Sequence, residues 1–466
     1  MGAGLSAEVV RLDLTSSREA CGNCRVAPSR RMLPPMSPNT CKSILCVALA
    51  AVALSSAQAA DFDATLEAVD SKVIAWRRDF HQNPELSDHE VRTAKSVAEH
   101  LRKLGLEVTT GVAHNGVIGL LKTGKPGPTI ALRADMDALP VTERVDVPFK
   151  STVKSNYRGE EVGVMHACGH DSHTAVLMGV AEALTNLKDK LRGNVLFVFQ
   201  PAEEGMPPGE AGGASLMLEE GIFDKYKPEV AIGWHAWATL HVGEIGYRSG
   251  PFMADSNAWK IVVNGRQTHG SRPWRGIDPI VVAAQIVGAL QTVVSRQVDL
   301  TDQPAVFTVG AIKGGIRNNI IPDSVEMIGT MRTFSPVMKR QMVENITRMV
   351  AKTAEASGAS AKFELDPYNN PVVLNDPKLT ARLLPVLRKV AGVTAVKEIP
   401  LITGSEDFAY FAIKVPSFFY MVGVSPLAQD LATVPENHSP LFYIDEDAIP
   451  IATRALTTVT VDYLMK

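Results

Sequence analysis

The chain has 466 residues and a formal net charge of −3, with 45% apolar and 21% charged residues. These proportions are typical of a folded protein and exclude a disordered, collagen-like or coiled-coil chain. Because there is no excess of positive charge, we expect no nucleic-acid partner. The length suggests two or three domains.

Residues 1–59 differ in composition from the rest and predict a leader with a signal peptide. An unbroken apolar run, Ile44 to Leu54, follows basic residues and precedes Ala57-Gln58-Ala59, a small-x-small sequence typical of a cleavage site. A helix this short cannot cross about 30 Å of hydrocarbon, so we expect no stable membrane anchor. The sequence therefore predicts an exported protein, periplasmic or secreted, whose mature chain begins near Ala60. The true translation start stays open.

After the leader, apolar strands alternate with amphipathic helices. Apolar runs at 129–134, 194–199 and 230–234 each end in polar residues, and helical patterns such as 174–187 lie between them. Continuous apolar strands predict a sheet that is buried on both faces, as in an α/β/α domain. We assign this catalytic domain to residues 60–250 and 367–466. Ligands of such sheets bind beyond the carboxyl ends of the strands.

Residues 251–366 have a different pattern and predict an inserted domain. Its expected elements are strands at 259–263, 305–312, 324–334 and 362–365, and helices at 278–298 and 336–357. This βαββαβ order is that of the ferredoxin-like unit. The fold class is thus α/β, with a catalytic domain interrupted by a smaller insert.

The clearest candidate site is His166-Ala167-Cys168-Gly169-His170-Asp171-Ser172-His173, which opens a predicted helix. Cys168 and His170 are two residues apart, so in an extended loop their side chains share a face. Thiolate and imidazole are both good ligands for Zn²⁺. Because Cys168 is the only cysteine after the leader, we interpret this segment as a metal site.

Carboxylates and further histidines follow other predicted strands. Glu203 and Glu204 end the strand at 194–199, and adjacent extended residues point to opposite sides. One of the two can bind metal while the other faces a metal-bound water. Further candidates are His235, which follows another apolar run, and His438, which lies in a short polar loop. Asp135 and Asp137 follow a third strand and could orient the ligands.

Together with Arg133 to Pro140, Gln200 to Gly205, Trp234-His235 and Gly404 to Phe408, these segments resemble the two-metal aminoacylase and carboxypeptidase family. The branch that they resemble contains hippurate hydrolase and the plant auxin-amino-acid conjugate hydrolases. The resemblance extends from about Asp63 to the C-terminus. It implies an α/β catalytic domain with an inserted lid that also mediates dimerisation, and hence a homodimer.

The resemblance also implies residue roles. Two divalent metal ions would be held by Cys168, His170, Glu204, His235 and His438. Glu203 would be the general base, and Asn319 and Arg332 in the insert would hold the substrate. His269 would reach the active site, often from the partner subunit, and donate a hydrogen bond to the oxyanion. Zinc is the expected metal, although Mn²⁺, Co²⁺ or Ni²⁺ suit the same ligands.

The expected reaction is hydrolysis of the amide bond of an N-acyl amino acid, such as hippurate or an acetyl-amino acid, to a carboxylic acid and a free amino acid. One alternative is a carboxypeptidase or dipeptidase with the same site. Another is a zinc-stabilised binding protein, although a structural zinc site is closed by four ligands and here five are implied. The sequence leaves open the acyl group, the amino acid, the metal and the roles of Asp135 and Asp137.

Overall fold

The computed structural model describes residues 62–206, 211–367 and 369–465. The expected leader and signal peptide lie outside the described residues. The described chain has the predicted α/β fold, and its two main sheets are described in turn below. Residues 62–82 form the first described helix.

The larger sheet has eight strands in the order β1-β2-β6-β3-β7-β18-β8-β17. The central strands β6, β3, β7 and β18 are parallel, while β2 pairs antiparallel with β6 and β1 pairs antiparallel with β2. Their bounds are β1 (Glu107–Val112), β2 (Gly116–Lys122), β3 (Thr129–Asp135), β6 (Asn194–Gln200), β7 (Val230–His241), β8 (Ile245–Tyr247), β17 (Val396–Glu398) and β18 (Ser417–Ser425).

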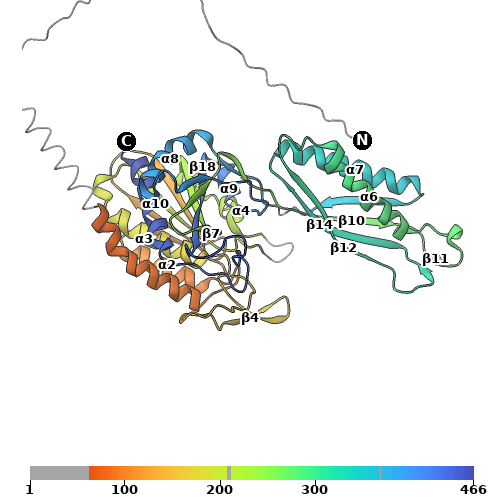
Figure 1. Cartoon of the computed structure of the whole chain (residues 1–466), viewed down its shortest axis with the longest axis horizontal. Helices are drawn as coiled ribbons and strands as arrows, with labels where there is room; N and C mark the ends of the chain where they lie inside the picture. Colours follow the sequence, from red (N-terminus) through yellow and green to blue (C-terminus); the bar gives the residue numbers. More distant parts are fainter. Residues whose placement is uncertain (1–61, 207–210, 368, 466) are drawn as a thin grey trace, which may run out of the picture. The chain divides into compact units, whose positions relative to one another are not determined.

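Helices cover both faces of this sheet (Figure 1). Along β6, Val195, Phe197 and Phe199 pack into one core cluster, whereas Leu196 and Val198 pack into the other. This alternation is the burial on both faces predicted from the apolar strands. One face carries α2 (Val91–Lys103), α3 (His170–Asn186), α8 (Pro377–Ala391) and α10 (Ala448–Leu464), and the other carries α4 (Gly213–Glu219), α5 (Ile222–Tyr226) and α9 (Ala409–Ala412).

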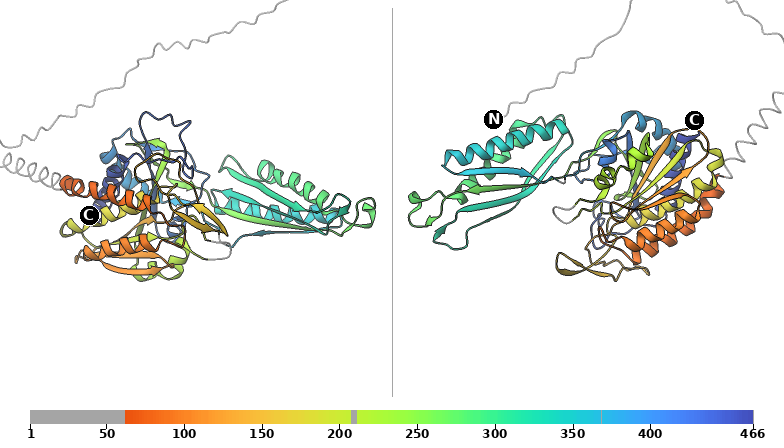
Figure 2. Two further views of the ribbon diagram at one scale, coloured as in Figure 1. Left: turned by 90° about the horizontal axis from the view of Figure 1, so that it is seen from below. Right: turned by 180° about the vertical axis from the view of Figure 1, so that it is seen from behind.

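The second sheet has four antiparallel strands in the order β12-β14-β10-β15. It is formed by β10 (Asn257–Asn264), β12 (Ala305–Gly314), β14 (Ser324–Thr333) and β15 (Ser360–Leu365), with α6 (Pro279–Gln297) and α7 (Pro336–Ala356) against one face (Figure 2). This is the ferredoxin-like βαββαβ order, and it lies within the range expected for the insert.

The starts of the two insert helices follow from local sequence. The Asp278 carboxylate accepts a hydrogen bond from the N–H of Ile280, and the Ser335 hydroxyl accepts one from Met338, with proline in the first turn of each helix. By length and composition alone α6 could also cross a membrane. Its buried residues, such as Ile286 and Leu290, pack into the core of the insert.

Three short two-stranded sheets complete the described strands. They pair β9 (Gly250–Met253) with β16 (Val373–Asn375), β11 (Thr268–His269) with β13 (Ile320–Ile321), and β4 (Lys154–Tyr157) with β5 (Glu160–Gly163). Strand β9 covers the first residues of the range expected for the insert and β16 follows that range, so their pairing joins the two connections of the four-stranded sheet. Strand β7 is longer than predicted: it does not end before His235, because β18 pairs with it along its length as far as His241.

Candidate metal centre

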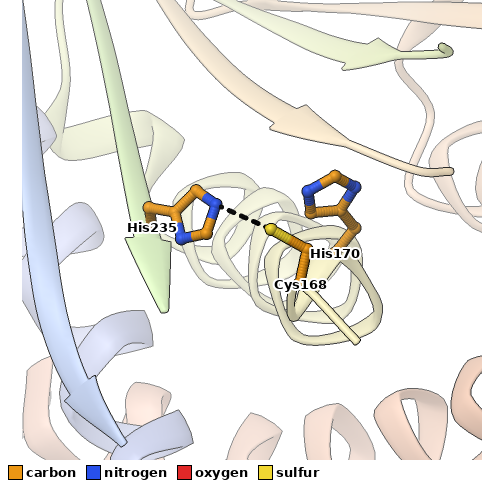
Figure 3. Close-up of side chains that lie close together, drawn as sticks. All are labelled: Cys168, His170 and His235. Atoms are coloured by element: carbon orange, nitrogen blue, oxygen red, sulfur yellow. Dashed lines mark hydrogen bonds between the residues drawn. The ribbon is translucent and has the colours of Figure 1, made fainter. Parts of the chain in front are cut away.

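The five predicted metal ligands converge in the structure. Cys168 Sγ lies 3.3 Å from His235 Nε2 and 3.3 Å from His438 Nε2. Glu204 Oε1 lies 3.2 Å from His438 Nε2 and 4.0 Å from His170 Nε2. Figure 3 shows the sulfur directed at His235, with His170 beside it. Residues that are up to 270 positions apart in the sequence therefore present their ligand atoms to one small volume.

Local turns place these side chains. His170 is the first residue of α3, and Gly169 before it has a left-handed φ of 101°. A Cβ atom on Gly169 would lie 2.9 Å from the Cβ of Ala236, so only glycine lets this turn approach β7 so closely. The His438 N–H donates to the carbonyl of Ala167 at 2.7 Å and ties the C-terminal loop to the Cys168 loop.

Hydrogen bonds leave the Nε2 atoms of two histidines available for metal. His170 Nδ1 bonds the carbonyl (2.8 Å) and carboxylate (3.2 Å) of Asp137, and His235 Nδ1 bonds the carbonyl of Ala236 at 2.7 Å. A proton on each Nδ1 leaves the lone pair of Nε2 free. Within the described residues, His170 Nε2 and Glu204 Oε1 are buried and have no hydrogen bond of suitable geometry, although His438 Nε2 lies close to Glu204 Oε1. Metal ions would satisfy these atoms, so the donor set fits the implied cofactor.

Asp135 and Asp137 lie directly behind the ligands. Asp137 holds His170, and its carboxylate also accepts from the N–H of Glu204 at 3.0 Å. Asp135 bonds His173 Nδ1 at 2.6 Å, and His173 Nε2 accepts from the N–H of Ala236 at 2.8 Å. These contacts support the orienting role predicted for both aspartates. Asp135 Oδ2 is 3.7 Å from His170 Nε2, and Asp135, His170 and His173 form a further group whose ligand atoms lie close enough together to hold a metal ion.

Glu203 lies beside the ligands and among other carboxylates. Its Oε1 accepts from the N–H of Asp407 at 3.3 Å, and its carboxylate lies within 4.8 Å of those of Glu406 and Asp407. Burial and the nearby carboxylates of Glu406, Glu204 and Asp407 raise the pKa of Glu203 well above its usual value. A carboxylate of raised pKa next to metal ligands suits a group that takes up and returns a proton.

A buried arginine links the carboxylates around Glu203, and the sequence analysis assigned it no role. The guanidinium of Arg133 donates to Asp135 (2.6 Å), Glu406 (2.8 Å), Asp407 (3.0 Å) and Gln200 (2.9 Å). One signal was present in the sequence, since a charged residue inside the apolar strand at 129–134 needs buried partners. Asp135 is two residues away in the same strand, whereas Gln200, Glu406 and Asp407 are distant in sequence.

A cavity of about 1020 Å³ opens beside the ligands and includes Arg332 of the insert. Within the described part of the chain, Arg332 Nη1 is buried without a hydrogen-bond partner. The other two predicted insert residues do not line this cavity. His269 is exposed, and its Nδ1 accepts from the N–H of Ser271, while the Asn319 carbonyl accepts from Gly270 at 2.8 Å. The structure therefore places His269 in β11 and Asn319 directly before β13, the strand that pairs with β11.

Comparisons with known proteins agree with this geometry. The sequence profile described as peptidase family M20/M25/M40 matches residues 131–461. Thermostable carboxypeptidase 2 of Saccharolobus solfataricus is 39% identical over 401 residues, which are 85% of this chain and 97% of that protein. N-acetylcysteine deacetylase of Bacillus subtilis is 37% identical (85% and 97%). IAA-amino acid hydrolase ILR1-like 2 of Arabidopsis thaliana is also 37% identical (84% and 85%).

Solved structures show the same fold. A putative aminohydrolase from methicillin-resistant Staphylococcus aureus is 37% identical, with a TM-score of 0.79 over 86% of this chain and 98% of that one. The YXEP protein of Bacillus subtilis, described as a dinuclear metal binding peptidase from the M20 family, is 34% identical. Its TM-score is 0.70, over 85% of this chain and 99% of that one.

Proposed function

Since the chain belongs to peptidase family M20/M25/M40, we propose that it hydrolyses the amide bond of N-acyl amino acids with two divalent metal ions and releases a carboxylic acid and a free amino acid. Membership confirms the family predicted from the motifs, so the chain is an enzyme with amidohydrolase and peptidase relatives. The two relatives named for N-acetylcysteine deacetylase and IAA-amino acid hydrolase activity support an acyl substrate.

The observation that carries the proposal is the cluster of five ligands with Glu203 beside it. A closed structural zinc site uses four ligands. This cluster has five predicted ligands and faces a cavity. The ligands suit two ions, as in the relative described as a dinuclear metal binding peptidase. Bound metal ions would polarise the amide carbonyl and acidify a water molecule. Zinc is the metal we propose, and Mn²⁺, Co²⁺ and Ni²⁺ suit the same ligands.

The remaining steps fall to side chains of this chain. Glu203 takes a proton from the attacking water and returns it to the departing amine. Arg332 binds the substrate carboxylate, because its guanidinium lines the cavity with an unpartnered Nη1. We further propose that the chain is a homodimer and that His269 and Asn319 act on the substrate in the partner subunit.

A second candidate is a carboxypeptidase or dipeptidase with the same site, which the 39% identity to a thermostable carboxypeptidase favours. The test is metal analysis followed by assays on hippurate, acetyl-amino acids, dipeptides and longer peptides. We expect N-acyl amino acids to have the highest kcat/KM. Faster cleavage of peptides with a free amino terminus would favour the second candidate.

A zinc-stabilised binding protein without activity would behave differently on chelation. We expect chelation to abolish hydrolysis while the circular dichroism spectrum persists, and added metal to restore activity. Unfolding on chelation, in a chain that hydrolyses none of these substrates when loaded, would instead indicate a structural metal site.

A further inference from the structure

Strand β7 carries a large aromatic side chain next to a metal ligand. Successive residues of a strand alternate between faces, so His235 and Trp237 share one face of β7, while Ala236 packs into the core on the other. The register between β7 and β18 shifts after Trp237, and Leu240 packs in the same core cluster as Trp237. The rings of His235 and Trp237 have centroids 6.0 Å apart and are nearly perpendicular. Trp237 is partly exposed and lines the cavity. The indole of Trp237 therefore lies inside the cavity, beside a predicted metal ligand.

The same cavity lining includes the apolar side chains of Leu240, Met253, Ile399 and Ile402. With Trp237 they form what we call the apolar wall. Backbone hydrogen bonds place Ile402 beside β9, because its N–H donates to Phe252 and its carbonyl accepts from Ala254. Trp237, Ile399 and Ile402 are only partly buried and pack against a core cluster that includes Leu240 and Met253.

A glycine makes room for part of the apolar wall. A Cβ atom on Gly246 of β8 would lie 2.9 Å from Cδ1 of Ile399 and 2.9 Å from Cδ1 of Leu240. These two side chains thus occupy the space above Gly246. The apolar wall therefore continues the core cluster that includes Leu240 and Met253 as far as the cavity. Large apolar side chains that are partly exposed inside a cavity are a typical surface for binding an apolar ligand.

The guanidinium that could bind the substrate carboxylate comes from another element, although polar side chains such as Thr239 and Thr403 line the cavity beside the apolar wall. Arg332, Ser256 and Asn370 belong to the insert and to its two connections, whereas the apolar wall comes from β7, β9 and the segment after β17. If a substrate binds with its carboxylate at Arg332 and its amide at the metal ligands, its acyl group lies against the apolar wall.

We propose that the apolar wall is the acyl subsite and that it selects bulky apolar acyl groups, aromatic or medium-chain, over acetyl. This inference rests on the proposed function and specifies its substrate class. The cavity of about 1020 Å³ is at the upper end of the range that encloses drug-sized ligands, and an acetyl group would leave the wall in contact with water. Each methylene group that the wall buries should raise kcat/KM about fourfold.

The test compares acetylglycine, hexanoylglycine and benzoylglycine with the metal-loaded enzyme. We expect kcat/KM for the two bulky substrates to exceed that for acetylglycine at least about tenfold, and by up to about 250-fold for hexanoylglycine if all four of its additional methylene groups are buried. Trp237→Ala should lower kcat/KM for the bulky pair about tenfold or more and change acetylglycine less than about threefold. Ile399→Ala should act in the same direction if Trp237→Ala fails to fold. The matched control is Ile413→Ala, since Ile413 is 60% exposed at the end of α9, outside the cavity lining.

A binding measurement separates this inference from the proposed function. Calorimetry with the metal-loaded chain should show hexanoate binding more tightly than acetate, and Trp237→Ala should abolish the difference. If no acylglycine is hydrolysed but this binding pattern holds, the proposed reaction is wrong and the subsite stands. Equal kcat/KM for the three substrates, or equal loss for all three in Trp237→Ala and Ile399→Ala, overturns the subsite.

Discussion

Glu203 is the residue on which the chemistry most directly depends. Glu203→Gln preserves the shape of the side chain but removes the base, so we expect full metal content and a turnover lower by about 10²–10⁴. Metal analysis and the hydrolysis rate of the best N-acyl substrate measure the two effects. Glu204→Gln is the matched control, because Glu204 contacts His438 and should lose metal as well as activity. Near-normal turnover in metal-loaded Glu203→Gln would contradict the assignment.

Arg133 is expected to matter for stability. Its side chain is 2% exposed, and Arg133→Met would leave the buried carboxylates of Asp135, Glu406 and Asp407 without their cation. Breaking such a set should lower the free energy of unfolding by about 3–5 kcal/mol. Chemical denaturation of the chelated chain measures this. Arg158→Met, at an exposed turn, is the control and should change the value by less than about 1 kcal/mol. Equal effects of the two changes would show that the network is not stabilising.

At the scale of elements, the turn before α3 affects both the stability of the fold and the position of the metal ligands. In Gly169→Ala the substituted residue has to adopt a left-handed φ, and its Cβ atom lies too close to the Cβ of Ala236. Cys168 and His170 must therefore shift relative to β7. We expect lower metal occupancy together with a lower Tm. Gly105→Ala has a similar φ of 79° but open space around it, and it should lose about 1 kcal/mol of stability and keep its metal. Full metal occupancy in Gly169→Ala would show that the close approach to β7 is not required.

The elements that could be predicted are those with a local signal. Asp278 and Ser335 begin helices with capping side chains, and the strand at 194–199 is a continuous apolar run. The spacing of Cys168 and His170 likewise predicts, from neighbouring residues alone, that the two side chains share a face. Apart from Asp135 in the same strand, the partners of Arg133 could not be predicted, because they come from β6 and from the segment before α9. The extension of β7 beyond His235 depends on pairing with β18, which is distant in sequence.

At the scale of the whole molecule, the leader predicts where the mature chain begins. If the signal peptide is cleaved after Ala57-Gln58-Ala59, N-terminal sequencing of the protein exported by the source cell should begin near Ala60. Replacing Ala57 and Ala59 with large residues should leave the precursor uncleaved. A mature protein that retains residues 36–59 would contradict the prediction of a cleaved signal.

His269 and Asn319 of the insert could act on the substrate of their own subunit or of a second subunit. His269 lies in β11 and Asn319 directly before its partner strand β13, and both residues are exposed and outside the lining of their own chain's cavity. This placement fits residues that complete the site of a second copy. If His269 stabilises the oxyanion, His269→Ala should lower kcat by about 10²–10³ with unchanged metal content. Full activity of His269→Ala would remove the insert from the mechanism.

Mixing two inactive variants shows in which subunit His269 acts. A mixed dimer of His269→Ala and Glu203→Gln has one site with both groups intact only if His269 crosses to the partner. At equal amounts and complete subunit exchange, half of the dimers are mixed and each has one intact site, so activity should return to about a quarter of the native value. Native mass spectrometry of differently tagged chains verifies the exchange. Exchange without recovered activity would place His269 in the site of its own chain, which would require the insert to bring β11 to that chain's own metal ligands during catalysis.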